Sequence, residues 1–141
     1  MKLVIASDHA GYDLKEFLKV NIKNVEEWTD CGTYSSESVD YPDFAHKLAS
    51  IVSANPEQKA ILICGSGNGV AITANKHPHV RAALCWCEDI ASLAVQHNNA
   101  NVLVLPARFI SQEKALKIVT AFFSASFEGG RHQKRVEKIN L

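Results

Sequence analysis

One short segment combines a possible reactive group with a glycine-rich turn. The segment CGSGNG at residues 64–69 follows the apolar run AILI at residues 60–63. Gly65, Gly67 and Gly69 would let backbone N–H groups turn toward a ligand, and a helix starting there would favour negative charge. The pattern fits a phosphate, or an oxygen that becomes anionic during a reaction. The alternative is a plain strand-to-helix turn that needs positive φ at one or two glycines.

Cys64 is the candidate reactive group of this segment, and Ser66 stands two residues after it. Backbone amides and a helix start favour the thiolate form, which can act as a base or a nucleophile. An unreactive cysteine at a strand end fits equally well, because free cysteines are commonly buried. The segment is not a Walker loop, which would end in Gly-Lys-Ser/Thr. A cysteine-phosphatase loop is disfavoured because Val70 stands where an arginine would clamp the phosphoryl group.

Further polar groups that could bind a ligand lie in other parts of the sequence. Asp8 and His9 follow the first apolar run and offer a hydrogen-bond acceptor and a switchable donor. His97 stands where a helical pattern gives way to an apolar run, and a histidine there is as often a helix cap as a catalyst. The candidate anion-binding side chains are Arg108, Arg131, His132 and Arg135, although the last three also fit a solvated charged tail.

Alternating elements must position these groups. Short apolar runs at residues 3–6, 25–29, 60–63, 80–85 and 102–105 predict buried strands, and helical spacing follows each of them. Asp40 followed by Pro42 predicts one helix start, and Ser111 predicts another. The pattern indicates an α/β fold, a three-layer Rossmann-like sandwich around a five-stranded parallel sheet. The expected strand order is 2-1-3-4-5.

This order predicts where a ligand would bind. In such sheets ligands bind beyond the carboxyl ends of the strands, where the strand order reverses, here between the first and third strands. The Ser7-Asp8-His9 and CGSGNG segments both follow those two strands. His97 precedes the fifth strand, which we expect at the opposite edge of the sheet. It should therefore act on the site of a neighbouring subunit.

Composition narrows the class of protein. The 141 residues carry 15 basic and 15 acidic side chains, which disfavours a general nucleic-acid or acidic-membrane binder. No apolar run approaches the roughly 18 residues of a membrane span, and no signal-peptide pattern is visible, so we expect a cytoplasmic protein. The four cysteines, including Cys85 and Cys87, lack the usual zinc spacing, so no metal site is expected. We expect one domain over residues 1–141.

Five segments in collinear order resemble the ribose-5-phosphate isomerase B family, which includes galactose-6-phosphate isomerase subunits. They are SDHAGY, DCGTYSSESVDYPDFA, CGSGNGVAITANK, QHNNANVLVLPAR and EGGRHQKRVEKI, which together span essentially the whole chain. The resemblance implies aldose–ketose isomerisation of a sugar phosphate through a cis-enediol, without metal or nucleotide cofactors. It also implies dimers, often paired into tetramers, whose active sites are each built from two chains.

The resemblance also implies roles for individual residues. Cys64 matches the base that moves a proton between C1 and C2, and His97 matches the residue that opens the furanose ring. Residues matching the hole that stabilises the enediolate oxygen are Ser66 and the loop amides of Gly65, Gly67, Asn68 and Gly69. The other matches are Asn98 beside His97, Asp8 and His9 as sugar and phosphate contacts, Tyr41 in the pocket wall, and Arg108, Arg131, His132 and Arg135 as the phosphate clamp.

One branch of the family uses a glutamate base a few residues later and lacks the cysteine. Val70 fills the glutamate position here while Cys64 is present, so the cysteine branch fits, although the SGNG spelling resembles the glutamate branch. The expected reaction interconverts ribose 5-phosphate and ribulose 5-phosphate. The alternatives are a hexose-6-phosphate isomerase acting on galactose or allose 6-phosphate, and a noncatalytic sugar-phosphate-binding subunit. The tail at about residues 126–141 should contribute to phosphate binding or subunit contacts.

Overall fold

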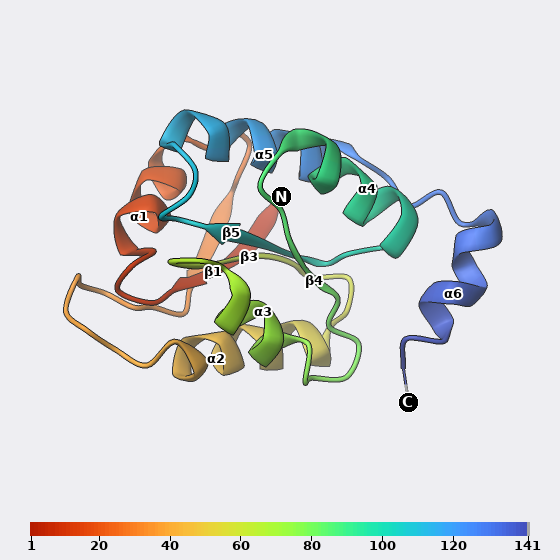
Figure 1. The fold of residues 1–141 in the computed structure, drawn as a ribbon, viewed down its shortest axis with the longest axis horizontal. Coiled ribbons are helices and arrows are strands. Elements are labelled where there is room, and N and C mark those ends of the chain that lie inside the picture. The colour runs from red at the N-terminus through yellow and green to blue at the C-terminus, as the bar shows by residue number, and fades with distance from the viewer. Residues whose placement is uncertain (141) are drawn as a thin grey trace.

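A five-stranded parallel sheet lies between two layers of helices (Figure 1). The computed structural model describes residues 1–140. The strands are β1 (Lys2–Ser7), β2 (Glu27–Asp30), β3 (Lys59–Cys64), β4 (Ala82–Leu84) and β5 (Val102–Pro106). The helices are α1 (Tyr12–Asn21), α2 (Tyr41–Ala54), α3 (Asn68–Ala74), α4 (Glu88–Asn98), α5 (Gln112–Ser124), the 3₁₀ turn η1 (Gly130–His132) and α6 (Gln133–Glu137). The predicted α/β fold class is therefore confirmed.

The strand order corrects one part of the prediction. The observed order is β2-β1-β3-β5-β4, so the last two strands exchange places relative to the expected 2-1-3-4-5. All five residues of β5 are buried, and this strand pairs with both β3 and β4. β4 has only three residues, all of them half-buried. A short strand suits an edge, whereas a continuous apolar run suits a position between two neighbours.

Alternate residues of the strands face two separate cores. Leu3 and Ile5 of β1 pack with α1, α4 and α5, whereas Val4 and Ala6 pack with α2 and α3. Figure 1 shows the same arrangement, with α1, α4 and α5 on one face and α2 and α3 on the other. The strands read as unbroken apolar runs because both of their faces are covered.

The helix ends agree with the sequence in most respects. Ser111 caps α5, and its Oγ accepts a hydrogen bond from the Lys114 N–H at 3.0 Å. Asp40 precedes α2 and Pro42 lies in its first turn, but the Asp40 side chain makes no capping hydrogen bond. The tail with α6 lies at the side of the molecule, near the end of α4 (Figure 1). Within residues 1–140, no helix is both long enough and apolar enough to cross a bilayer.

Candidate active site

A cavity of about 500 Å³ opens at the carboxyl ends of β1 and β3. Its lining includes eight of the predicted site residues, namely Asp8, His9, Tyr41, Cys64, Gly65, Ser66, Gly69 and Arg108, together with Ala10 and Phe109. A second cavity of about 450 Å³ lies beside α5, but no carboxylate, imidazole or thiol lines it within residues 1–140. The first cavity is therefore the candidate site for acid–base chemistry.

The loop after β3 closes around the Cys64 sulfur. Cys64 is only 5% exposed, and its Sγ accepts a hydrogen bond from the Gly67 N–H at 3.2 Å. Gly67 has φ +78°, and a Cβ there would collide with the Leu84 side chain. The turn therefore requires glycine at this position, yet it also directs a backbone donor at the thiol. The turn interpretation of the segment is therefore confirmed, whereas ligand binding by the loop stays a prediction.

Two other loop glycines permit close approach by neighbouring side chains. A Cβ at Gly65 would lie 3.1 Å from Nη1 of Arg108, and a Cβ at Gly69 would collide with the Tyr41 ring. Arg108 thus lies against the Cys64 loop, on the connection that follows β5. Ser66 is exposed at the rim of the cavity, where its Oγ accepts a hydrogen bond from the Asn68 N–H at 3.3 Å.

Asp8 and His9 leave β1 toward the same cavity. The buried Asp8 carboxylate accepts a hydrogen bond from the Gly11 N–H at 3.1 Å, which fixes its position. Nδ1 of His9 accepts a hydrogen bond from the Val39 N–H at 3.1 Å. A neutral imidazole that accepts at Nδ1 carries its proton on Nε2. His9 therefore offers an N–H donor to a bound molecule.

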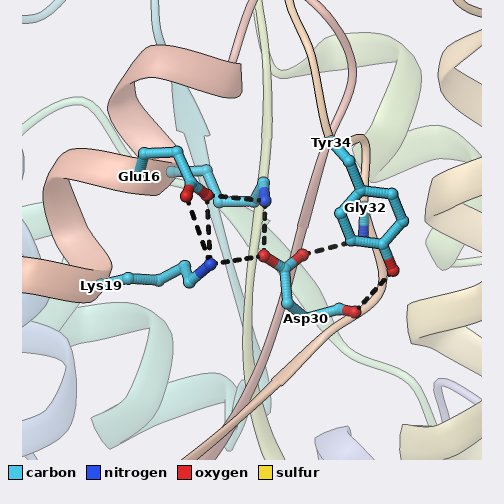
Figure 2. Close-up of polar contacts among 6 residues, drawn as sticks. Glu16, Lys19, Asp30, Gly32 and Tyr34 are labelled. Atoms are coloured by element: carbon cyan, nitrogen blue, oxygen red, sulfur yellow. Dashed lines mark hydrogen bonds and ion pairs between the residues drawn. The ribbon is translucent and has the colours of Figure 1, made fainter.

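A buried ion-pair network supports the connection from β2 to α2, residues 31–40. Lys15 is fully buried, and its Nζ lies 2.6 Å from Oδ2 of Asp30 and 2.9 Å from Oε2 of Glu16. Figure 2 shows Asp30 between Lys19, which donates to it at 2.7 Å, and the connection, where the Gly32 N–H donates at 2.8 Å. The Tyr34 hydroxyl also donates to the Asp30 carbonyl at 2.9 Å. This network holds the connection that supplies the Val39 donor.

The charges of this network act on the Asp30 carboxyl. Burial raises the pKa of Asp30, but hydrogen bonds from Lys15, Lys19 and Gly32 outweigh it, so the net pKa lies below its usual value. Sequence reasoning missed these residues. Lysines on a helix usually lie at the surface, and the only available signal was an aspartate at the end of a predicted strand.

A second polar cluster forms where the tail meets α4. The His97 and His132 rings stack at 4.2 Å between centroids, and Oε1 of Glu128 lies 3.8 and 3.7 Å from their Nε2 atoms. His132 is buried, whereas His97 is partly exposed. Burial and the positive charges of His97 and Arg131 lower the pKa of His132. Glu128 was not among the predicted site residues.

The remaining predicted residues lie near this second cluster or on the outer side of the Cys64 loop. Arg131 and Arg135 are exposed, and neither forms an ion pair or side-chain hydrogen bond within residues 1–140. Asn98 ends α4 beside His97 and lines a separate cavity of about 310 Å³. Gly67 and Asn68 belong to the Cys64 loop, but they do not line the candidate cavity.

The structure keeps His97 away from the Cys64 cavity, though the predicted reason was wrong. β5 lies next to β3 rather than at the far edge, so edge position does not separate the two groups. α4 runs back from the end of β4 to the start of β5, which puts His97 at the amino end of the sheet. Cys64 lies at the carboxyl end. The two groups of predicted site residues therefore lie at opposite ends of the sheet.

Comparisons with known proteins give consistent results. Residues 3–139 match the family model described as Ribose/Galactose Isomerase. The chain is 46% identical to a probable ribose-5-phosphate isomerase B of Mycoplasma genitalium, covering 97% of this chain and 92% of that protein. It is 42% identical to the ribose-5-phosphate isomerase B of Escherichia coli, covering 98% and 93% of the two chains.

Solved structures agree with these sequence matches. The crystal structure of a ribose 5-phosphate isomerase from Thermotoga maritima superposes with a TM-score of 0.94, with 50% identity and coverage of 99% and 97% of the two chains. A Mycoplasma genitalium ribose-5-phosphate isomerase B structure with bound ribulose-5-phosphate superposes with a TM-score of 0.92, with 46% identity and coverage of 98% and 93%.

Proposed function

The chain belongs to the ribose/galactose isomerase family, and on this premise we propose that it interconverts ribose 5-phosphate and ribulose 5-phosphate. The relatives that carry this activity in their names match nearly the whole chain, and one of them was solved with bound ribulose-5-phosphate. The observation that carries the proposal is the buried Cys64 thiol, which accepts a backbone hydrogen bond and lines the same cavity as Asp8, His9 and Arg108. We propose a cytoplasmic enzyme of one domain that uses no cofactor.

The proposed chemistry is a proton transfer between adjacent carbons. The Cys64 thiolate takes the proton from C2 of the open-chain aldose, and the carbonyl oxygen on C1 becomes negatively charged. N–H groups of residues 65–69 then stabilise this enediolate oxygen, and for this the N–H groups of Gly67 and Asn68 exchange their present acceptors, Sγ of Cys64 and Oγ of Ser66. The proton returns to C1, and the proton of the O2 hydroxyl is transferred to O1, which completes the ketose.

Ring opening requires the second group of side chains. We propose that His97 of a second subunit reaches the Cys64 cavity and transfers a proton to the ring oxygen of the furanose. Arg108 lies beside Cys64, while Arg131, His132 and Arg135 lie near His97. The phosphate would then be clamped between two chains, with Arg108 from one and the tail residues from the other. Asp8, His9 and Tyr41 would hold the sugar.

Mixing two inactive variants tests this arrangement. Cys64→Ala and His97→Ala are purified separately, then unfolded, mixed in equal amounts and refolded together. If each site takes Cys64 from one chain and His97 from the other, half of the dimers are mixed and each mixed dimer has one intact site. About a quarter of the wild-type ribose 5-phosphate isomerase activity should return.

Two controls show that any recovered activity comes from mixed dimers. Each variant refolded alone must show only its own residual activity, and the double variant mixed with wild type must give no more activity than the wild-type chains supply. Failure of the mixed sample, together with recovery of refolded wild type, would reject the shared site. A panel of pentose and hexose phosphates then decides the sugar, because the family description includes both ribose and galactose isomerases.

A further inference from the structure

The stacked histidines and Glu128 form a set of metal ligands that the proposed reaction does not use as such. One ring nitrogen of His97, one of His132 and a Glu128 carboxylate oxygen all lie within 4.8 Å of one another. In a four-coordinate zinc site with bonds of about 2.0–2.2 Å, neighbouring ligand atoms are about 3.3 Å apart. The two separations involving Glu128, 3.8 and 3.7 Å, exceed this by about half an ångström.

The three ligand atoms can move closer together by this amount. His132 is fixed, because its side chain is only 10% exposed, whereas His97 and Glu128 are 38% and 52% exposed. The two rings are almost parallel, at 14°, so their lone pairs do not yet converge on one point. Rotation of the His97 ring about its Cβ–Cγ bond would aim Nε2 toward the position that the other two groups share. His132 thus gives the fixed part of the site, and His97 and Glu128 give the movable part.

The three groups also lack competing partners. Within residues 1–140, no side chain or backbone group forms a hydrogen bond with any of these three side chains, and their mutual distances are too long for one. Two histidines and one glutamate are a recognised zinc ligand set, which leaves a fourth position open.

We propose that His97, Glu128 and His132 bind one divalent transition-metal ion, with zinc the best fit, and that the bound ion inhibits isomerisation. Imidazole ligands select zinc, copper and nickel over magnesium and calcium. Arg131 and Arg135 are exposed on the same tail and oppose a cation, so we expect moderate affinity. The inhibition rests on the proposed function, because a metal on His97 blocks the imidazole that opens the ring. The binding itself does not depend on that function.

A second pair of histidines could also bind the metal and must be removed by mutation before the test. Nδ1 of His46 and Nε2 of His77 are hydrogen-bonded at 2.7 Å on the surface, and two imidazoles can bind a transition metal weakly. The experiment therefore uses a His46→Ala/His77→Ala protein as its starting form. Co²⁺ is titrated into it, because the visible absorption of Co²⁺ distinguishes imidazole and carboxylate ligands from thiolates, and Zn²⁺ is then added in competition.

We expect one Co²⁺ per chain with a nitrogen–oxygen spectrum, displaced by Zn²⁺. Glu128→Gln and His132→Ala should each weaken binding at least tenfold, while Glu137→Gln, a control carboxylate on the same tail, should leave it unchanged. Absence of binding at millimolar Co²⁺, a thiolate spectrum, or binding that survives both variants would overturn the metal site.

The inhibition is measured separately on the starting form. Zn²⁺ should compete with sugar phosphate, and Glu128→Gln should raise the inhibitory concentration at least tenfold. If the metal binds at this cluster but turnover is unaffected, the inhibitory role is wrong and the site stands. If the metal binds but no sugar phosphate is isomerised at all, the proposed function fails while the metal site remains.

Discussion

The Cys64 cavity and the His97 cluster carry complementary side chains but are supported in different ways. The cavity is attached to the sheet by backbone hydrogen bonds: Ser7 N–H donates to the Gly32 carbonyl at 2.6 Å, and Ala107 N–H donates to the Cys64 carbonyl at 2.9 Å. The tail of the cluster is joined to α4 by one backbone hydrogen bond, from Glu128 N–H to the Gln96 carbonyl at 3.0 Å, and by stacked imidazoles.

This difference shows which of the two regions has its geometry set within one chain. In the cavity, the side chains of Asp8, His9 and Cys64 each accept a hydrogen bond from a backbone N–H, so their geometry is set when the sheet folds. In the cluster the arginines have no partners within the described residues, and His97 is partly exposed. We infer that the cluster reaches its working geometry only against another surface. The changes below separate the two regions, from the largest expected effect to the smallest.

Cys64→Ala should have the largest effect on turnover. Loss of a general base lowers kcat by about 10² to 10⁴-fold, and substrate binding should change little. A coupled assay with ribose 5-phosphate measures kcat and KM. Turnover at the wild-type rate would show that the cavity does not contain the base.

His97→Ala should affect the cyclic sugar selectively. We expect weak activity on ribose 5-phosphate and higher residual activity on an open-chain analogue, because only ring opening needs this imidazole. Rates on the two substrates are compared in the same preparation. Equal losses on both would contradict a role in ring opening.

Lys15→Met should destabilise the cavity region rather than remove a reactive group. It removes the closest partner of the half-buried Asp30 carboxylate, which keeps only Lys19 and the Gly32 N–H, and this costs about 1.5–3 kcal/mol in the free energy of unfolding. Urea denaturation measures the loss. Lys19→Met is the matched control, because Lys19 contacts the same carboxylate from a partly exposed position, and its effect should be clearly smaller.

The same carboxylate predicts a pH dependence of stability. The pKa of Asp30 is lower in the folded chain than its ordinary value of 3.8. Its contribution to stability is therefore complete above that value and is lost as the pH falls toward the folded pKa. Asp30→Asn should flatten the loss of stability below about pH 4, measured by urea denaturation at several pH values. An unchanged acid profile would mean that other carboxyls dominate.

Arg135→Gln tests the cluster without disturbing the fold. A charge-assisted hydrogen bond contributes about 1.5–3 kcal/mol, so KM for the sugar phosphate should rise about 10 to 100-fold. Unfolding should be unaffected, since the side chain is exposed. Lys134→Gln removes an exposed positive charge from the adjacent residue and should leave KM near the wild-type value.

Ser111→Ala should have the smallest effect, in neither region. Loss of the cap of α5 costs about 1 kcal/mol of stability. Thermal unfolding measures this shift, and kcat and KM should stay unchanged. A loss of activity would show that α5 is coupled to one of the two regions.

The sequence predicted which residues line the cavity better than it predicted the strand order and the ion pairs that hold the cavity in place. Asp8 and Cys64 were expected together because β1 and β3 are adjacent under either strand order. The exchange of β4 and β5 was missed, because apolar runs at 80–85 and 102–105 look alike before it is known that only three residues of the first form a strand. Lys15 was missed because no local pattern distinguishes a buried helical lysine from a solvated one.

The hydrogen bond from Val39 to His9 has a consequence for sequence variation. Its donor is a main-chain N–H, so nearly every residue at position 39 preserves it, and proline alone lacks that donor. The protonation pattern of this imidazole is thus protected against most single mutations at position 39. Natural variants can therefore differ in the side chain at position 39 while His9 keeps its proton on Nε2.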